Sequence, residues 1–247
     1  FSVAATGTTL TYQWQISTNG CSTFSDLANG APYSGATSAT LTITGAATGL
    51  NNSSYRCIIN GACPGTATTN CTLLTVNTPL AVTAQPANST FCAGAAATFT
   101  VAVSGTTPTY QWQQSTNGGT SFTNIINGGI YSGATTAAVT LTGITAGMNG
   151  NQYRCVVTGS CTPSATSAAA LLTVVTSVTL TSQPVNTVVC DGANTSFSVV
   201  GSGSGIIYQW QVSTATVPAF TNIAGATSAT LSLNAVTTGL NGNQYRC

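Results

Sequence analysis

The sequence has almost no charged side chains. It contains 247 residues with no lysine, glutamate or histidine, and its only charged residues are three arginines and two aspartates. Charged residues make up 2% of the chain, against about 25% in an average soluble domain. General acids and bases are usually histidine, lysine or paired carboxylates, and Asp26 and Asp191 are too few and too far apart to form such a pair. We therefore predict that the chain is not an enzyme.

The same scarcity argues against several partners and cofactors. A net charge of +1 lacks the clustered basic residues that nucleic acid or an anionic membrane would require. Two aspartates cannot build the oxygen cage of calcium, and the cysteine spacing is not that of a zinc site, so no metal or cofactor is expected. No apolar run approaches the roughly 18 residues of a spanning helix, so we expect no membrane insertion.

Cysteine, in contrast, is plentiful. The chain has nine cysteines and no histidine, a combination that favours disulfides over metal binding. Because disulfides persist in oxidising compartments, an extracellular or cell-surface location is expected.

Two motifs recur along the chain at a nearly constant distance. YQWQ occurs three times at intervals of 98 residues, and the third YRC arrives six residues early. The tryptophans of YQWQ are Trp14, Trp112 and Trp210, and the tyrosines of YRC are Tyr55, Tyr153 and Tyr245. Self-similarity at a fixed period indicates tandem domains. The missing residues of the third copy indicate a shortened loop or edge strand.

The repeat register predicts three domains, at residues 1–76, 77–175 and 176–247. In this register only the middle repeat is whole, because the first begins after its first strand and the third stops before its last strand. Short joins with β-type residues predict closely coupled modules. We expect the sequence to be a slice of a longer chain or a subunit completed by strands from its neighbours.

Apolar residues within a repeat alternate with a period of two. In "ATFTVAVSG" (97–105), Phe99, Val101 and Val103 alternate with small or polar residues, and the runs are bounded by clusters of Gly, Asn, Ser or Pro. This pattern is typical of short strands with one buried face. An all-β fold made of three antiparallel β-sandwiches of about 98 residues is therefore predicted.

A strand with an inward tryptophan, a Leu-x-Ile or Leu-x-Leu strand and then Tyr-x-Cys together resemble the immunoglobulin-like domain, across the whole chain as three tandem copies. The resemblance implies that the motif tryptophans and tyrosines form the core. It also implies a tyrosine corner, in which the tyrosine hydroxyl bonds to upstream backbone. The wider pattern "C-x-G … YQWQ-x-ST … YSGAT … Y-R-C" is similar to arrays in large secreted and cell-surface proteins of Bacteroidota-type bacteria. That similarity implies an extracellular adhesive or filament-forming role.

The chain departs from the immunoglobulin-like pattern at the first cysteine. Val3, Val101 and Val199 occupy that position, and a cysteine lies nine residues earlier in the second and third repeats. From this resemblance we predict relocated bridges that join Cys92 to Cys155 and Cys190 to Cys247. The alternative pairs Cys57 with Cys63 and Cys155 with Cys161 across the last hairpin; an Asn60-Gly61 turn would place the first of these pairs on opposite faces.

The partner of Cys57 is expected to lie before Phe1, and four cysteines are then left after this assignment: Cys21, Cys63, Cys71 and Cys161. Three of them, Cys21, Cys71 and Cys161, are candidates for contacts between modules or subunits. One interpretation is a further bridge within the first repeat, from Cys21 to Cys71. Another is a covalent staple between modules or subunits, with Cys161 facing the preceding module.

Two classes of function are compatible with the sequence. In the first, the repeats form an extracellular fibre, with other copies of the chain or adjacent repeats as partners, because low net charge promotes association. In the second, they form an adhesin stalk or an array that binds surface glycans. We expect the three arginines of the YRC motifs, Arg56, Arg154 and Arg246, to lie on the solvent face of their strand. Each is interpreted as a solvated or hydrogen-bonding cation, and the alternative is a docking group for a neighbouring module or a sugar carboxylate.

Overall fold

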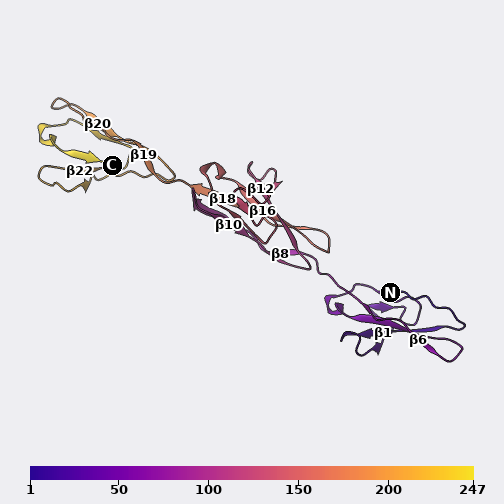
Figure 1. Cartoon of the computed structure of the whole chain (residues 1–247). Coiled ribbons are helices and arrows are strands. Elements are labelled where there is room, and N and C mark those ends of the chain that lie inside the picture. The colour runs from indigo at the N-terminus through magenta and orange to yellow at the C-terminus, as the bar shows by residue number, and fades with distance from the viewer. The chain divides into compact units, whose positions relative to one another are not determined.

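The computed structural model describes all residues from Phe1 to Cys247. It is built from short strands, as the period of two predicts, and three short 3-10 helices (Figure 1). No helix combines the length and hydropathy needed to cross a bilayer.

The middle repeat has two facing sheets. Its elements are β8 (Ala81–Ala84), β9 (Ser89–Cys92), β10 (Ala97–Thr100), β11 (Ala102–Ser104), β12 (Thr109–Ser115), β13 (Thr123–Asn124), β14 (Tyr131–Ser132), β15 (Ala138–Leu141), η2 (Ala146–Met148), β16 (Gln152–Thr158), β17 (Ala165–Thr166) and β18 (Ala170–Val175). One of these sheets has the order β13-β12-β16-β18-β9, with β17 also paired to β16, and the other has the order β10-β15-β14. A third sheet has two strands, β11 and β8. Only the pairing of β18 with β9 is parallel.

The first repeat contains the counterparts of the strands from β12 onward. Its elements are β1 (Thr11–Ser17), β2 (Ser25–Asp26), β3 (Tyr33–Ser34), β4 (Thr42–Ile43), η1 (Thr48–Leu50), β5 (Ser54–Asn60), β6 (Thr66–Thr68) and β7 (Thr72–Leu73). The strands β2, β1, β5 and β6 form one sheet, in which β7 also pairs with β5.

The third repeat follows the same order as far as the YRC strand. Its elements are β19 (Thr179–Ser182), β20 (Thr195–Ser198), β21 (Val200–Ser202), β22 (Gln211–Ser213), β23 (Thr221–Asn222), β24 (Thr230–Leu233), η3 (Thr238–Leu240) and β25 (Gln244–Arg246). The sheet β20-β24 has two strands, whereas β10-β15-β14 has three. The missing strand is the counterpart of β14, so the shorter loop of this repeat removes an edge strand.

A tryptophan lies at the centre of each sandwich. Trp14 is 3% exposed, and Trp112 and Trp210 are both fully buried. Each indole Nε1 donates a hydrogen bond of 2.9 Å to a backbone carbonyl, that of Ser38, Thr136 or Ser228. The predicted burial of these tryptophans is confirmed, and the hydrogen bond removes the cost of burying an indole N–H.

The motif tyrosines stack on phenylalanines of the opposite sheet. Ring centroids lie 4.9 Å apart for Phe99 and Tyr153, and 5.0 Å apart for Phe197 and Tyr245. The expected tyrosine corner is not formed: the Tyr55 hydroxyl lies 3.2 Å from the Tyr33 hydroxyl, and the Tyr153 hydroxyl has no hydrogen-bond partner. Stacking keeps the Tyr153 hydroxyl inside the core, where burial raises its pKa above the ordinary value.

Candidate functional site

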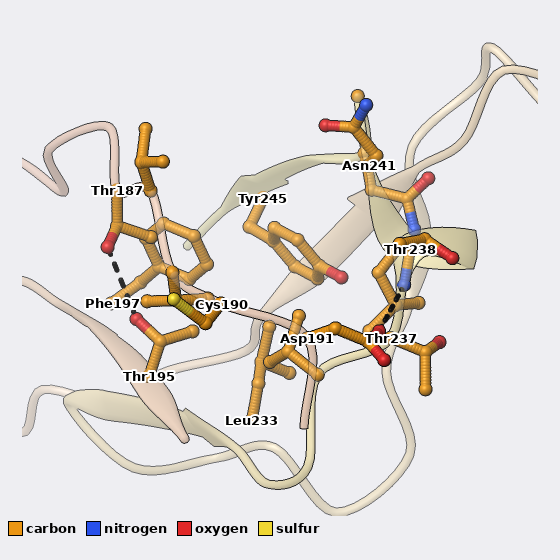
Figure 2. A pocket seen from close by; sticks show the side chains of 16 residues that line it. Thr187, Cys190, Asp191, Thr195, Phe197, Leu233, Thr237, Thr238, Asn241 and Tyr245 are labelled. Carbon is orange, nitrogen blue, oxygen red and sulfur yellow. Dashed lines mark hydrogen bonds between the residues drawn. The ribbon is translucent and has the colours of Figure 1, made fainter. Parts of the chain in front are cut away.

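The third repeat carries an open groove beside its YRC strand. The groove has a volume of about 250 Å³ and is lined by apolar and polar side chains, among them Cys190, Phe197, Leu233 and Tyr245. Figure 2 shows the Tyr245 ring lying across it, between Phe197 on one side and Thr238 and Asn241 on the other. The Asp191 carboxylate accepts a 3.0 Å hydrogen bond from the Thr238 backbone N–H at the start of η3.

In the middle repeat, β18 occupies the corresponding position. Its inward residues Ala170 and Leu172 are fully buried, and Val174 is 6% exposed. The Leu172 N–H donates to the Asn151 carbonyl, and the Gly150 N–H donates to the Leu172 carbonyl, both at 2.9 Å. The strand β18 therefore closes the core and satisfies the backbone of the turn before β16.

An asparagine side chain completes this contact. The Asn149 Oδ1 accepts a 2.9 Å hydrogen bond from the Val174 N–H. The first repeat repeats the arrangement, because the Asn51 Oδ1 accepts from the Val76 N–H at 2.9 Å and the Leu74 N–H donates to the Ser53 carbonyl at 2.8 Å. Two repeats thus hold their last strand by the same backbone and asparagine contacts.

The third repeat presents the same groups without a strand. The counterparts are the Gly242 N–H, the Asn243 carbonyl and the Asn241 Oδ1, and none of them forms a hydrogen bond in the structure. Residues 187–190, the counterpart of β9, are not a strand here, since β9 is held by parallel pairing with β18. Val188 is 98% exposed and Leu240 is 37% exposed.

The structure contains one disulfide, between Cys21 and Cys71 of the first repeat. This is the within-repeat pairing considered for the leftover cysteines. It occupies both partners, so the structure has no staple from Cys21 to Cys161. The Cys161 thiol is partly exposed and unbonded.

The relocated bridge predicted between Cys92 and Cys155 is not formed. Cys92 pairs with Val175, four residues beyond Leu171, and Leu171 pairs with Gln152 at the start of β16. Cys155 lies three residues from Gln152 in the opposite direction along this antiparallel pair, whereas a disulfide needs Cα atoms within about 7 Å. Cys190 and Cys247 are likewise exposed and unbonded.

The alternative hairpin bridge is also absent. Cys57 is fully buried and Cys63 is exposed at the hairpin, and the two are not joined. The Cys57 thiol donates a 3.6 Å hydrogen bond to the Ile58 carbonyl. Burial raises the pKa of the Cys57 thiol, and it raises the pKa of the Cys155 thiol to about 11, so both behave as small apolar core residues.

The three arginines form the same contact in every repeat, which we call the arginine clamp. Arg154 Cζ lies 3.9 Å from the centre of the Phe122 ring, and its Nε donates to the Gln113 Oε1 at 2.8 Å. The Gln113 amide donates in turn to the Asn124 Oδ1 at 2.9 Å. The ring and the amide hold the guanidinium plane in one orientation.

The clamp of the first repeat differs from the other two at one position. The arginines Arg56 and Arg246 lie 3.6 Å and 4.0 Å from the ring centres of Phe24 and Phe220. Their Nε atoms donate to Gln15 and Gln211, and these amides donate to Asp26 and Asn222. The first repeat thus has a carboxylate where the others have a neutral amide.

The phenylalanine of the clamp was not predicted from the sequence. A signal was available, because each phenylalanine stands two residues before the Asp or Asn, in "FSD", "FTN" and "FTN". The contact was not predicted because the arginine and the phenylalanine lie about 30 positions apart in the sequence. The spacing of motifs does not show which distant residues lie side by side in the fold.

Residues 81–176 and 179–246 match the family described as "Domain of unknown function (DUF8696)". The chain belongs to this family. The two matched segments make up more than half of the chain and lie in its second and third repeats. No curated protein matches the chain.

Solved structures show the fold of this DUF8696 chain. An I-band fragment of titin, I67–I69, has 13% sequence identity and a TM-score of 0.64, covering 96% of this chain and 83% of the fragment. An E-to-A variant of the same three-Ig fragment gives the same values. At this identity the likeness concerns fold alone. The chain is therefore a tandem array of immunoglobulin-like β-sandwiches, as predicted.

Proposed function

We propose that this chain is a structural segment of an extracellular fibre built from stacked, disulfide-stabilised immunoglobulin-like repeats. The observation that carries the proposal is the tandem array of β-sandwiches in one chain, whose only charged residues are three arginines and two aspartates. Sheet edges with so few charged side chains favour association between copies.

The surface supports association over catalysis. Charged residues are 2% of the chain and the net charge is +1, so little electrostatic repulsion separates copies. The disulfide between Cys21 and Cys71 supports an oxidising, extracellular or cell-surface location. Other copies of this chain or neighbouring repeats of the same family are the proposed partners.

Electron microscopy and analytical ultracentrifugation of the purified chain test the proposal. Filaments with an axial repeat in multiples of roughly 35–40 Å, the length of a sandwich with strands of about ten residues, are expected. A chain that remains monomeric at every concentration measured contradicts the proposed function.

The arginine clamp favours a second candidate, an adhesive array that binds acidic glycans. The Nε of Arg154 is the only group of its guanidinium that is hydrogen-bonded within the chain. Its remaining donors form a rigid fork that matches a carboxylate. Isothermal titration with oligogalacturonate is expected to show binding that Arg154→Gln weakens, with neutral oligogalactose as the control ligand. Equal binding of both sugars contradicts this candidate.

A further inference from the structure

We propose that one residue of each arginine clamp, the last residue of β2, β13 or β23, decides whether the clamp binds the carboxylate of an acidic sugar. Asparagine at this position permits binding, as in the clamps of Arg154 and Arg246. Asp26 opposes binding in the clamp of Arg56. This inference rests on the second candidate function, an adhesive array that binds acidic glycans, and specifies which of its sites are open to the ligand.

Each clamp contains a row of three side chains on neighbouring strands. In the first repeat, Gln15 lies directly opposite Arg56 on one side and Asp26 on the other. In the third repeat, Gln211 lies between its arginine and its asparagine in the same way. Directly opposite residues of antiparallel strands point to the same face of a sheet. The row lies on the outer face, because the tryptophan next to the glutamine in sequence points into the core.

The guanidinium of every clamp keeps free donors. Only its Nε is hydrogen-bonded within the chain, to Gln15, Gln113 or Gln211. The phenylalanine ring and the glutamine already hold the guanidinium plane, so a ligand has little side-chain freedom left to restrict. The remaining N–H groups form the fork that suits the two oxygens of a carboxylate.

The asparagine of the middle repeat adds to these donors. The Asn124 Oδ1 accepts a 2.9 Å hydrogen bond from the Gln113 amide. The Nδ2 of the same side chain carries two N–H groups, and neither forms a hydrogen bond in the structure. The clamp of Arg154 therefore combines one uncompensated positive charge with free donors from two side chains, which is the chemistry that an anion requires.

Asp26 reverses this chemistry in the first repeat. The Gln15 amide donates to the Asp26 Oδ1 at 2.6 Å and accepts from the Arg56 Nε at 2.7 Å. The corresponding bonds of the middle repeat are longer, at 2.9 Å and 2.8 Å, as expected when charge assists only the first set. A single amide group separates the guanidinium from the carboxylate, so their charges compensate each other within the row.

The size of the effect follows from the distance between the charges. A sugar carboxylate bound to Arg56 would lie closer to Asp26 than the Debye length, which is about 8 Å at physiological ionic strength. Two like charges roughly 7 Å apart repel enough to weaken binding about threefold in water, and more near a protein surface. The clamp of Arg56 is therefore expected to bind the ligand at least about threefold more weakly than the clamp of Arg154.

Nuclear magnetic resonance of the arginine side chains tests the inference on the 247-residue chain. The chain contains three arginines, one in each clamp, so the three Nε–H signals report the three sites separately. Single substitutions to lysine, Arg56→Lys, Arg154→Lys and Arg246→Lys, assign the signals. The ligand is oligogalacturonate, and neutral oligogalactose is the control.

The measured quantity is the midpoint, the ligand concentration that gives half of the shift of a signal. The signals of Arg154 and Arg246 are expected to have similar midpoints. The midpoint of Arg56 is expected to be about threefold higher or more. Neutral oligogalactose is expected to shift none of the three signals, because it has no carboxylate.

Two substitutions that preserve side-chain shape test the deciding residue. Asp26→Asn is expected to lower the midpoint of Arg56 to that of Arg154. Asn124→Asp is expected to raise the midpoint of Arg154 about threefold or more and to leave that of Arg246 unchanged as the internal reference. The clamp forms with either residue in the structure, so both variants are expected to fold. Equal midpoints of Arg56 and Arg154 in the wild-type chain, or midpoints that neither substitution moves, overturn the inference.

These outcomes separate the inference from the proposed functions. Three equal midpoints that depend on the sugar carboxylate support the adhesive function and overturn the role of Asp26. No shift at any clamp contradicts the adhesive function and the inference together. The expected midpoints in a chain that forms no filaments support the inference and contradict the fibre alone.

Discussion

The middle and third repeats share their motifs and central packing but differ in whether the core is covered. Tyr153 is fully buried and Phe99 is 1% exposed, whereas their counterparts Tyr245 and Phe197 are only partly buried. Trp112 and Trp210 are equally buried in both repeats. Burial of the tryptophan is therefore the same in both repeats. In the middle repeat, β18 mainly covers the stacked tyrosine and phenylalanine.

Truncating a buried side chain of β18 is expected to have the largest effect on the difference between the two repeats. Leu172→Ala is expected to lower the free energy of unfolding of the middle repeat by about 2–5 kcal/mol, because Leu172 is fully buried. The repeat should then expose apolar surface as the third repeat does. Urea unfolding and binding of a hydrophobic dye measure both effects.

Leu180→Ala in β19 is the control for this change. Leu180 is 42% exposed, so its truncation is expected to alter stability by no more than about 0.5 kcal/mol. If both variants have the same stability, β18 does not hold the middle repeat together.

The first repeat differs from the other two because a disulfide joins Cys21 to Cys71. Replacing Cys21 and Cys71 together by serine is expected to destabilise the first repeat by about 2–4 kcal/mol. The bond joins residues 50 positions apart, so its loss releases a long loop in the unfolded chain. Hydrogen exchange, read by repeat, is expected to change in residues 1–76 alone; equal change in the middle repeat would contradict the structure.

Alkaline pH is expected to lower the stability of the middle repeat. Burial raises the pKa of the Cys155 thiol from 9.0 to about 11. Between these values the unfolded chain has lost this proton while the folded chain keeps it, so stability falls as pH rises. Its counterpart Cys247 is exposed.

Unfolding midpoints measured from pH 8 to 11 test this expectation. Cys155→Ala is expected to reduce the pH dependence of the middle repeat. The Tyr153 hydroxyl, whose pKa burial also raises, contributes in the same direction in wild type and variant. An unchanged slope in Cys155→Ala contradicts the role given to this thiol.

The smallest effect concerns a feature that the two repeats share. Phe122→Leu and Phe220→Leu remove the aromatic face from the clamps of Arg154 and Arg246, and each is expected to destabilise its own repeat by about 0.5–1 kcal/mol. Equal losses in thermal unfolding would show that the clamp is independent of the last strand. A much larger loss in the middle repeat would show that the two are coupled.

Much of the fold could be predicted because it depends on local patterns. The period of two, the recurring YQWQ and YRC motifs and the shortened third copy led to three immunoglobulin-like sandwiches with buried tryptophans. The domain limits at 76/77 and 175/176 stay predictions. The disulfides were predicted less well, since pairing Cys92 with Cys155 required knowledge of how far apart two positions lie along neighbouring strands.

The strands, the repeat and the inward residues could be predicted from the sequence alone, because side-chain alternation and fixed spacing are properties of a single segment. The contacts between distant residues could be known from the tertiary structure alone. It brought Arg154 over Phe122 and joined Cys21 to Cys71. Such contacts depend on the register between strands that are distant in sequence, and composition and spacing do not specify that register.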